Sequence, residues 1–299
     1  MKASIALLAV WMFFGLACAE TAEPAPEVER KSDEVAAAAN VEAAREATER
    51  RLQLERSIDQ WWLAYERQEF GKAEGLATHI ETYVNAHYDV VAGDLTTASP
   101  RFRKVAAMAL GFSGRKDAVP GLMGALTDPF SDVIMAALLS LSQLAKSGTD
   151  VPTEPIVPYL SHSDEDIRSN ASLVLVHATR KGQSGLFLPL TSALEDASPN
   201  VRVHAAAALG ALGDADAVPF LTKTLDDAKA LVRIRAAYAL GRIGDRRAVP
   251  RLIDKIDDPD SDVSKASHKA LRDITGQEIS RVKRDWETYW DSQKAGERR

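Results

Sequence analysis

The sequence predicts an all-α fold, a right-handed α-solenoid of about six short helix pairs with an N-terminal helical extension. Two observations carry this prediction. A motif recurs along the chain at intervals close to 31 residues, and each copy contains two apolar stripes with the spacing of amphipathic helices. The composition agrees, because the 299-residue chain is 45% hydrophobic but only 6% aromatic. It is also rich in alanine, which suits closely packed helices better than a sheet core.

The repeat is clearest in two neighbouring copies. The segment VRVHAAAALGALGDADAVPFLTKTLDD begins at Val201, and VRIRAAYALGRIGDRRAVPRLIDKIDD begins 31 residues later at Val232. A third clear copy begins at Phe102, with weaker ones further along the chain. Together the copies predict first helices that begin near residues 102, 133, 167, 201, 232 and 263.

Each copy is predicted to form a helical hairpin. In the copy that begins at Val201, Gly213 follows the first apolar stripe and is placed to end that helix in the left-handed conformation. Asp214 or Asp216 can cap the second helix, and Ser198 can cap the first. One hairpin cannot bury its own apolar face, so the copies must stack into a solenoid.

The period and the LGxxGDxxAVPxL motif resemble the short HEAT-like repeats of the bilin-lyase type, which are widespread in bacterial proteins. The resemblance covers about residues 88–276 and implies an α-solenoid. The segment from Tyr88 to Leu95 fits a lone second helix before the first copy, and Trp286 and Trp290 would cover the last open face. The predicted organisation is a signal peptide (1–17), a flexible tether (18–34), N-terminal helices (35–87), the HEAT-like array (88–276) and a C-terminal capping helix and tail (277–299).

The first residues read as an export signal, because Lys2 is followed by an uncharged, mostly apolar run that ends at Ala19. The segment Gly15-Leu16-Ala17-Cys18 resembles the cleavage box of bacterial lipoproteins. This resemblance implies a lipid anchor at Cys18, the only cysteine, and a place in the periplasm or outer membrane. Cleavage after Ala19 with secretion, or retention of the run as an anchor, are the alternatives.

The tether is predicted because Pro24 and Pro26 interrupt an acidic stretch that has little to bury. From Val35 to Tyr65 the pattern becomes helical, and its second half carries a stripe of large apolar residues. We expect this stripe to pack on the domain that follows. A coiled-coil dimerisation helix is the alternative.

The sequence predicts no enzyme activity, cofactor or metal. Nucleophile-elbow, zinc-protease, P-loop and dinucleotide motifs are missing, and no histidine has a second one at metal-ligand spacing. The acidic cluster at residues 161–166 could hold a hard cation, but Ser163 with Asp166 reads better as a helix cap. The net charge of −6 does not supply the basic footprint that nonspecific nucleic-acid binding needs.

Arginine recurs at one position of the first helix, and aspartate recurs at the end of the second helix. A row of arginines could bind phosphate groups, but Ile134 and Ser264 interrupt this row. We therefore expect ion pairs between repeats. The residues concerned are Arg103, Arg168, Arg202 and Arg233, with Asp128, Asp196, Asp227 and Asp258.

The predicted function is a non-catalytic, protein-binding scaffold of the bacterial cell envelope, because solenoids expose extended concave surfaces. Alignment of the second helices gives outward columns that become charged and mostly basic toward the C-terminus. The expected partner is another protein or a peptide segment, with a membrane contacted through the lipid at Cys18. The alternative is a subunit of a HEAT-repeat enzyme such as a bilin lyase-like protein. The candidate protein-binding residues are Tyr159, Phe220, Lys223, Arg251 and Lys255.

Lipidation at Cys18 predicts that the mature protein enters the detergent-rich phase when a cell extract is phase-separated. Cys18→Ser removes the only thiol, so the variant should shift to the aqueous phase. Equal partition of the two proteins would contradict the lipid anchor.

Overall fold

The computed structural model describes residues 27–297, and within this range the chain forms α-helices and short 3-10 helices without strands. The predicted signal peptide, Cys18 and the beginning of the predicted tether lie outside the described residues. The chain divides into two compact units, residues 1–52 and residues 53–299. None of the described helices combines the length and the apolar character needed to cross a bilayer.

The first described helix, α1 (Glu27–Glu66), is 40 residues long. It begins at Glu27 and not at Val35, so the tether predicted for residues 18–34 ends earlier than expected. The physical reason is that Pro26 is the last proline of this region, and the residues after it can all donate backbone hydrogen bonds to a helix. Within the second unit, Leu54 and Ile58 of α1 are buried in the main hydrophobic core.

Two helices precede the repeats, α2 (Phe70–Ala86) and α3 (Tyr88–Thr97). Val91 and Leu95 of α3 are buried in the same core as the repeats. The ring of Tyr88 lies 3.9 Å from the guanidinium carbon of Arg115, between the first pair of repeat helices. Helix α3 therefore packs against the first repeat, where the sequence predicts a lone second helix.

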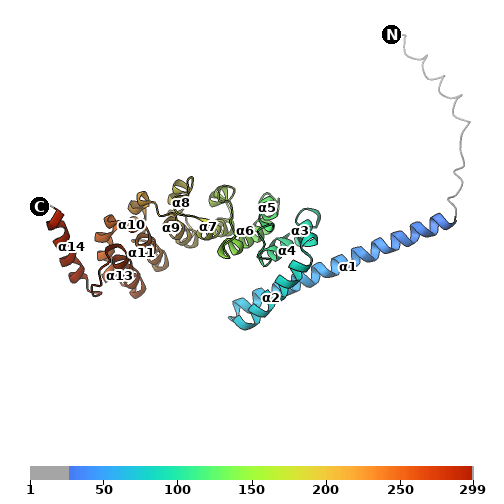
Figure 1. Ribbon diagram of the computed structural model, residues 1–299, viewed down its shortest axis with the longest axis horizontal. Helices are drawn as coiled ribbons and strands as arrows, with labels where there is room; N and C mark the ends of the chain where they lie inside the picture. Colours follow the sequence, from blue (N-terminus) through green and yellow to red (C-terminus); the bar gives the residue numbers. More distant parts are fainter. Residues whose placement is uncertain (1–26, 298–299) are drawn as a thin grey trace, which may run out of the picture. The chain divides into compact units, whose positions relative to one another are not determined.

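The first helices of the six copies stack in chain order (Figure 1). Each begins two residues before the predicted position, which confirms the repeat and its period. Neighbouring first helices pack directly on one another. They are α4 (Pro100–Gly111), α6 (Ser131–Lys146), α7 (Glu165–Ala178), α9 (Pro199–Leu212), α11 (Ala230–Ile243) and α13 (Ser261–Thr275).

The second helices are shorter than the first. In the second copy this element is a 3-10 helix, because Pro152, Pro155 and Pro158 remove backbone donors that an α-helix would need. Short 3-10 turns also flank α10 and α12. The elements are α5 (Ala118–Ala125), η1 (Val157–Ser161), α8 (Phe187–Ala193), η2 (Ala215–Ala217), α10 (Val218–Thr224), η3 (Arg246–Ala248), α12 (Val249–Asp254) and η4 (Lys255–Asp257).

The predicted helix caps are partly confirmed. Gly213 ends α9 with a left-handed φ of 68°, and the Asp214 carboxylate accepts a hydrogen bond from the Asp216 amide. Ser198 occupies the cap position of α9, but its hydroxyl makes no capping bond. At α7 the cap is Asp164 and not Ser163, because the Asp164 carboxylate accepts from the backbone two and three residues ahead.

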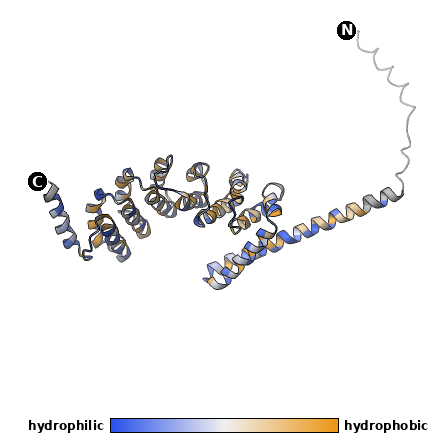
Figure 2. Ribbon diagram, viewed as in Figure 1, coloured by the Kyte–Doolittle hydropathy of each residue, from blue (hydrophilic) through white to orange (hydrophobic). Residues whose placement is uncertain are grey.

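Small residues let the first helices approach closely. A Cβ atom placed on Gly210 would lie 2.8 Å from the Ala239 Cα atom, and one on Gly241 would lie 3.0 Å from the Ala270 Cα atom. Glycine is therefore required where the backbones of neighbouring first helices meet. Figure 2 shows hydrophobic residues concentrated where the repeat helices face one another and a more hydrophilic α14.

The last helix, α14 (Lys283–Glu297), packs at the end of the array. Trp286 is fully buried, and its ring lies edge-to-face with His268 of α13 at 6.0 Å between centroids. The guanidinium carbon of Arg246 lies 5.3 Å from the centre of the Trp290 ring. These contacts place Trp286 against α13 of the last copy and Trp290 against η3 of the copy before it.

Gly210→Ala should destabilise the array by about 1–3 kcal/mol, because the added methyl overlaps the backbone of α11. Gly124→Ala is the matched control, since a Cβ there meets no atom within 4 Å. It should stabilise α5 by up to about 1 kcal/mol through helix propensity. Thermal unfolding followed by circular dichroism measures both, and equal effects would contradict the close approach at Gly210.

Candidate protein-binding face of the second helices

The candidate residue Tyr159 is tied into the fold. Its hydroxyl donates a hydrogen bond of 2.5 Å to the carbonyl oxygen of Leu126, which belongs to the preceding repeat. The ring faces His162 at 6.4 Å between centroids, and burial raises the pKa of the Tyr159 phenol. Tyr159 therefore holds η1 against the repeat before it, and its hydroxyl already has an internal partner.

Phe220 is exposed on α10 and belongs to an apolar strip. Its side chain is 44% exposed and meets Phe187 of α8 edge-to-face at 5.9 Å between ring centroids. Leu188 follows Phe187 and is 75% exposed. The aligned columns did not include Leu188, although Leu186, Phe187 and Leu188 form a run of three apolar residues. Three consecutive apolar residues cannot all lie on one buried helix face. The run therefore indicated in the sequence that one of its side chains would be exposed.

A hollow of about 580 Å³ opens between α8 and α10. Phe220 and Lys223 line it together with Leu194 and Pro219, and Glu195 and Asp226 contribute carboxylates. A second hollow of about 670 Å³ opens between η1 and α8, and Glu195 also lines that one. Tyr159 lines neither hollow. The structure thus brings Phe220 and Lys223 together and leaves Tyr159 apart.

The basic candidates are paired with carboxylates of the preceding repeat. Lys223 Nζ lies 2.8 Å from Glu195 Oε1. Arg251 and Lys255 both pair with Asp226, and the Lys255 Nζ atom lies 2.8 Å from its carboxylate. The pKa of Glu195 is lowered by its hydrogen bond from Lys223, and that of Asp226 is lowered by its hydrogen bond from Lys255.

These ion pairs change the expected charge of the face. The columns appear mostly basic in the sequence, but Glu195 and Asp226 offset the cations and link each second helix to the loop before it. The two acidic residues lie outside the columns, directly before the aspartate that ends each second helix. They recur as Glu195-Asp196 and Asp226-Asp227. This recurrence indicated in the sequence that carboxylates lie beside the basic residues, and alignment of the columns alone missed it.

The expectation of ion pairs between repeats was wrong, because the recurring arginines and aspartates pair within a repeat. Each arginine of the first helix makes two hydrogen bonds to the aspartate at the end of its own second helix, 25 or 28 residues later. The shortest distances are 2.6 Å for Arg103–Asp128, 2.8 Å for Arg168–Asp196, 2.7 Å for Arg202–Asp227 and 2.8 Å for Arg233–Asp258.

Each Arg–Asp pair also binds the backbone of two loops, the one before its first helix and the one after its second helix. Arg202 Nη1 donates to the carbonyl oxygens of Asp196 and Ala197, which precede its helix, at 2.8 and 3.1 Å. Asp227 accepts a further hydrogen bond of 2.8 Å from the Lys229 amide. Burial raises the pKa of Asp227, but the hydrogen bonds from Arg202 and Lys229 outweigh it and lower the pKa overall. These contacts occupy the arginines inside the fold and leave no phosphate-binding row.

The described residues hold no group of side chains placed to bind a metal ion. No group of three or more His, Cys, Asp or Glu within residues 27–297 is placed to hold a metal ion. A Ser–His contact does occur, with Ser172 Oγ 2.9 Å from His204 Nδ1. Ser172 is completely buried, so a substrate cannot reach its hydroxyl.

Comparison with known proteins identifies the repeat. Residues 94–175, 153–238 and 187–272 match the family model for HEAT repeats. No curated protein matches the chain.

Several solved structures share the fold. A designed armadillo repeat protein in complex with the peptide (KR)4 has a TM-score of 0.53 at 20% identity, covering 62% of this chain and 98% of that one. Another designed armadillo repeat protein has a TM-score of 0.50 at 22% identity, with the same coverages. An engineered protein has a TM-score of 0.51 at 21% identity, covering 66% of this chain and 97% of that one. At these identities the likeness concerns the fold alone.

Arg202→Ala should destabilise the protein by about 3 kcal/mol, because it leaves Asp227 largely buried without its counter-charge. Lys223→Ala is the matched control, since it breaks an ion pair whose two side chains are 79% and 73% exposed. Its cost should stay below about 1 kcal/mol. Denaturant unfolding measures both variants, and similar losses would contradict the structural role of the Arg–Asp pair.

Proposed function

This chain belongs to the HEAT-repeat family, and from that premise we propose that it is a non-catalytic scaffold that binds another protein or a peptide segment. Solenoid repeats use extended surfaces for binding. The observation that carries this proposal is the exposed Phe220, which packs against Phe187 and lines the open hollow between α8 and α10. Large apolar side chains that stay exposed next to a hollow are typical of protein interfaces.

The partner that fits this face is an extended segment with an apolar anchor. The anchor would enter the hollow against Phe220, and the ion pairs around it would form a polar rim. Arg251 keeps 41% of its side chain exposed and would attract an acidic group on the partner. A designed repeat protein of similar fold is known in complex with the peptide (KR)4, which supports a peptide as the kind of partner.

We also propose that the scaffold acts in the bacterial cell envelope. The support is the N-terminal sequence, where the apolar run and the lipoprotein-like box at Cys18 precede the proline-containing acidic segment. A lipid at Cys18 would hold the repeats beside a membrane while the binding face remains accessible to proteins.

Phe220→Ala should weaken binding of the partner about thirty-fold, because truncation of an interface anchor typically costs about 2 kcal/mol. Affinity capture from detergent-solubilised envelopes would identify the partner, and titration of the purified partner would measure the effect. Trp62→Ala is the matched control, because Trp62 is also 44% exposed but lies on α1. Tyr159→Ala is not suited to this test, because it also breaks the bond to Leu126.

Arg251→Glu adds an independent measurement of the same interface. Reversal of a rim charge should slow association and change its salt dependence, with a smaller effect on dissociation. If Phe220→Ala and Arg251→Glu both fold and bind the partner as the wild type does, the second helices do not form the interface.

A further inference from the structure

A separate hollow lies on the side of the first helices. It is enclosed by the C-terminal part of α1 and by α4, α6 and α7, and its volume is about 330 Å³. This size falls within the range of about 300–1,000 Å³ that is usual for small-molecule sites. The lining residues that the argument uses include Trp62, Tyr65, Gln143, Lys146, Leu173 and His177.

One wall of this hollow is aromatic. The Trp61 ring lies edge-to-face with Phe112 at 5.0 Å between centroids and stacks on Tyr65 at 5.7 Å. Trp62 and Tyr65 remain 44% and 54% exposed. The Trp62 indole N–H is satisfied by Glu66 at 2.8 Å. The aromatic faces are therefore preorganised and open, which suits a flat apolar ligand.

The other end of the hollow is polar and positively charged. Gln143 and Lys146 lie one turn apart on α6, and His177 lies on α7. Burial, and next the charge of Lys146, lower the pKa of His177, so the two groups are close neighbours. No Asp or Glu lines the hollow. Among the described residues, the side chains of Gln143, Lys146 and His177 form no hydrogen bond or ion pair, and the Ser147 hydroxyl donates only to the backbone carbonyl oxygen of Gln143.

This combination is unusual in a chain with a net charge of −6. On the second helices, Lys223, Arg251 and Lys255 are paired with carboxylates of the preceding repeat. Lys146 instead faces an aromatic hollow without a counter-charge. An anion placed beside Lys146 would supply the missing charge, and the Gln143 amide would donate a hydrogen bond to it.

We propose that this hollow binds a small amphiphilic anion, with a flat apolar body against Trp62, Tyr65 and Leu173 and a carboxylate or sulfonate at Lys146. The apolar body gains by covering the exposed aromatic faces. The anionic group selects the ligand, because a neutral analogue leaves Lys146 and Gln143 without a partner. The site is distinct from the second-helix face and goes beyond the scaffold function.

Two probes with the same ring system test the proposal, anilinonaphthalene sulfonate and the neutral phenylnaphthylamine. Each is titrated by fluorescence into the purified full-length protein. Lys146→Met should weaken the sulfonate about tenfold and leave the neutral probe unchanged within about twofold. Trp62→Ala should weaken both probes. Phe220→Ala, with the same 44% exposure as Trp62, should affect neither.

Three outcomes would overturn the proposal. The first is unchanged sulfonate affinity in Lys146→Met, and the second is equal loss in Phe220→Ala, which would place the probe on the second helices. The third is a dimer in sedimentation analysis that Trp62→Ala dissociates, because a second copy would then cover the aromatic wall. Circular dichroism melting of each variant separates loss of the site from loss of the fold, and Tyr65→Ala replaces Trp62→Ala if that variant unfolds.

Discussion

In four of the six repeats, an arginine on the first helix makes two hydrogen bonds to the aspartate that ends the second helix, and the rest of the array depends on this pair. Arg202 and Asp227 show why. The guanidinium also binds the loop before its helix, and the carboxylate also accepts from the backbone that starts the next helix. One ion pair therefore joins a hairpin to both of its neighbours. In the last repeat, Ser264 takes the arginine position and donates to the Ile256 carbonyl oxygen.

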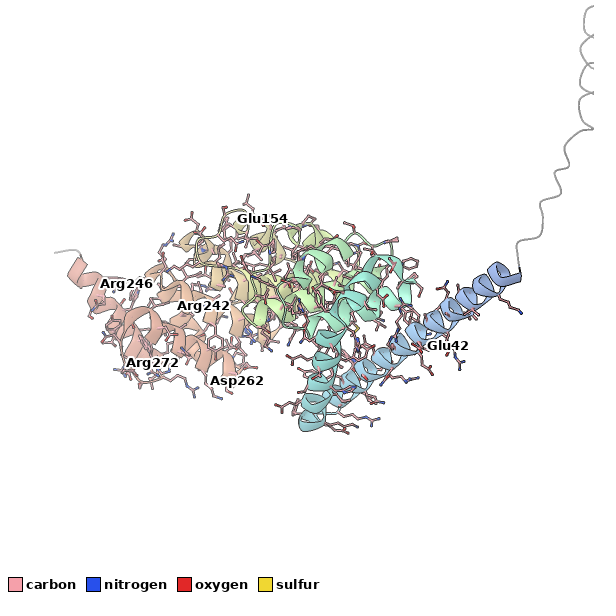
Figure 3. The ribbon with its side chains drawn as sticks, turned by 45° about the vertical axis from the view of Figure 1, so that its right-hand side comes forward. Glu42, Glu154, Arg242, Arg246, Asp262 and Arg272 are labelled. Carbon is pink, nitrogen blue, oxygen red and sulfur yellow. The ribbon has the colours of Figure 1, made fainter. Side chains whose placement is uncertain are left out.

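In these four repeats the Arg–Asp pair holds the second helix to its own first helix, so the second helices can lie further apart than the first helices do. The first helices meet closely at Gly210 and Gly241, whereas hollows of about 580 and 670 Å³ open between the second helices. In Figure 3, Glu154, which precedes η1, lies at the upper edge of the array and Arg272 of α13 lies at the lower edge. The proposed protein-binding face follows from this difference in spacing.

The two proposed sites differ in charge as well as in place. On the second helices, Lys223 and Lys255 are matched by Glu195 and Asp226, so the rim carries both signs. Beside α1 and α6, Lys146 has no carboxylate in the hollow that it lines. A protein segment with mixed polar groups fits the first surface, and a small anion fits the second. One repeat architecture thus offers two chemically different surfaces.

The sequence by itself determined the all-α solenoid, the start of each first helix, the left-handed glycine at Gly213 and the place of Trp286. These features depend on local spacing, and a repeated pattern fixes local spacing within each copy. Only the tertiary structure decided that Arg202 pairs with Asp227 of its own repeat, because a periodic sequence offers the arginine one aspartate before it, Asp196, and another after it, Asp227. It also decided that the Tyr159 hydroxyl points to Leu126. The hollow that joins Trp61 to Phe112 and His177 was not predictable, because α1 lies outside the repeat and no period relates it to the helices it meets.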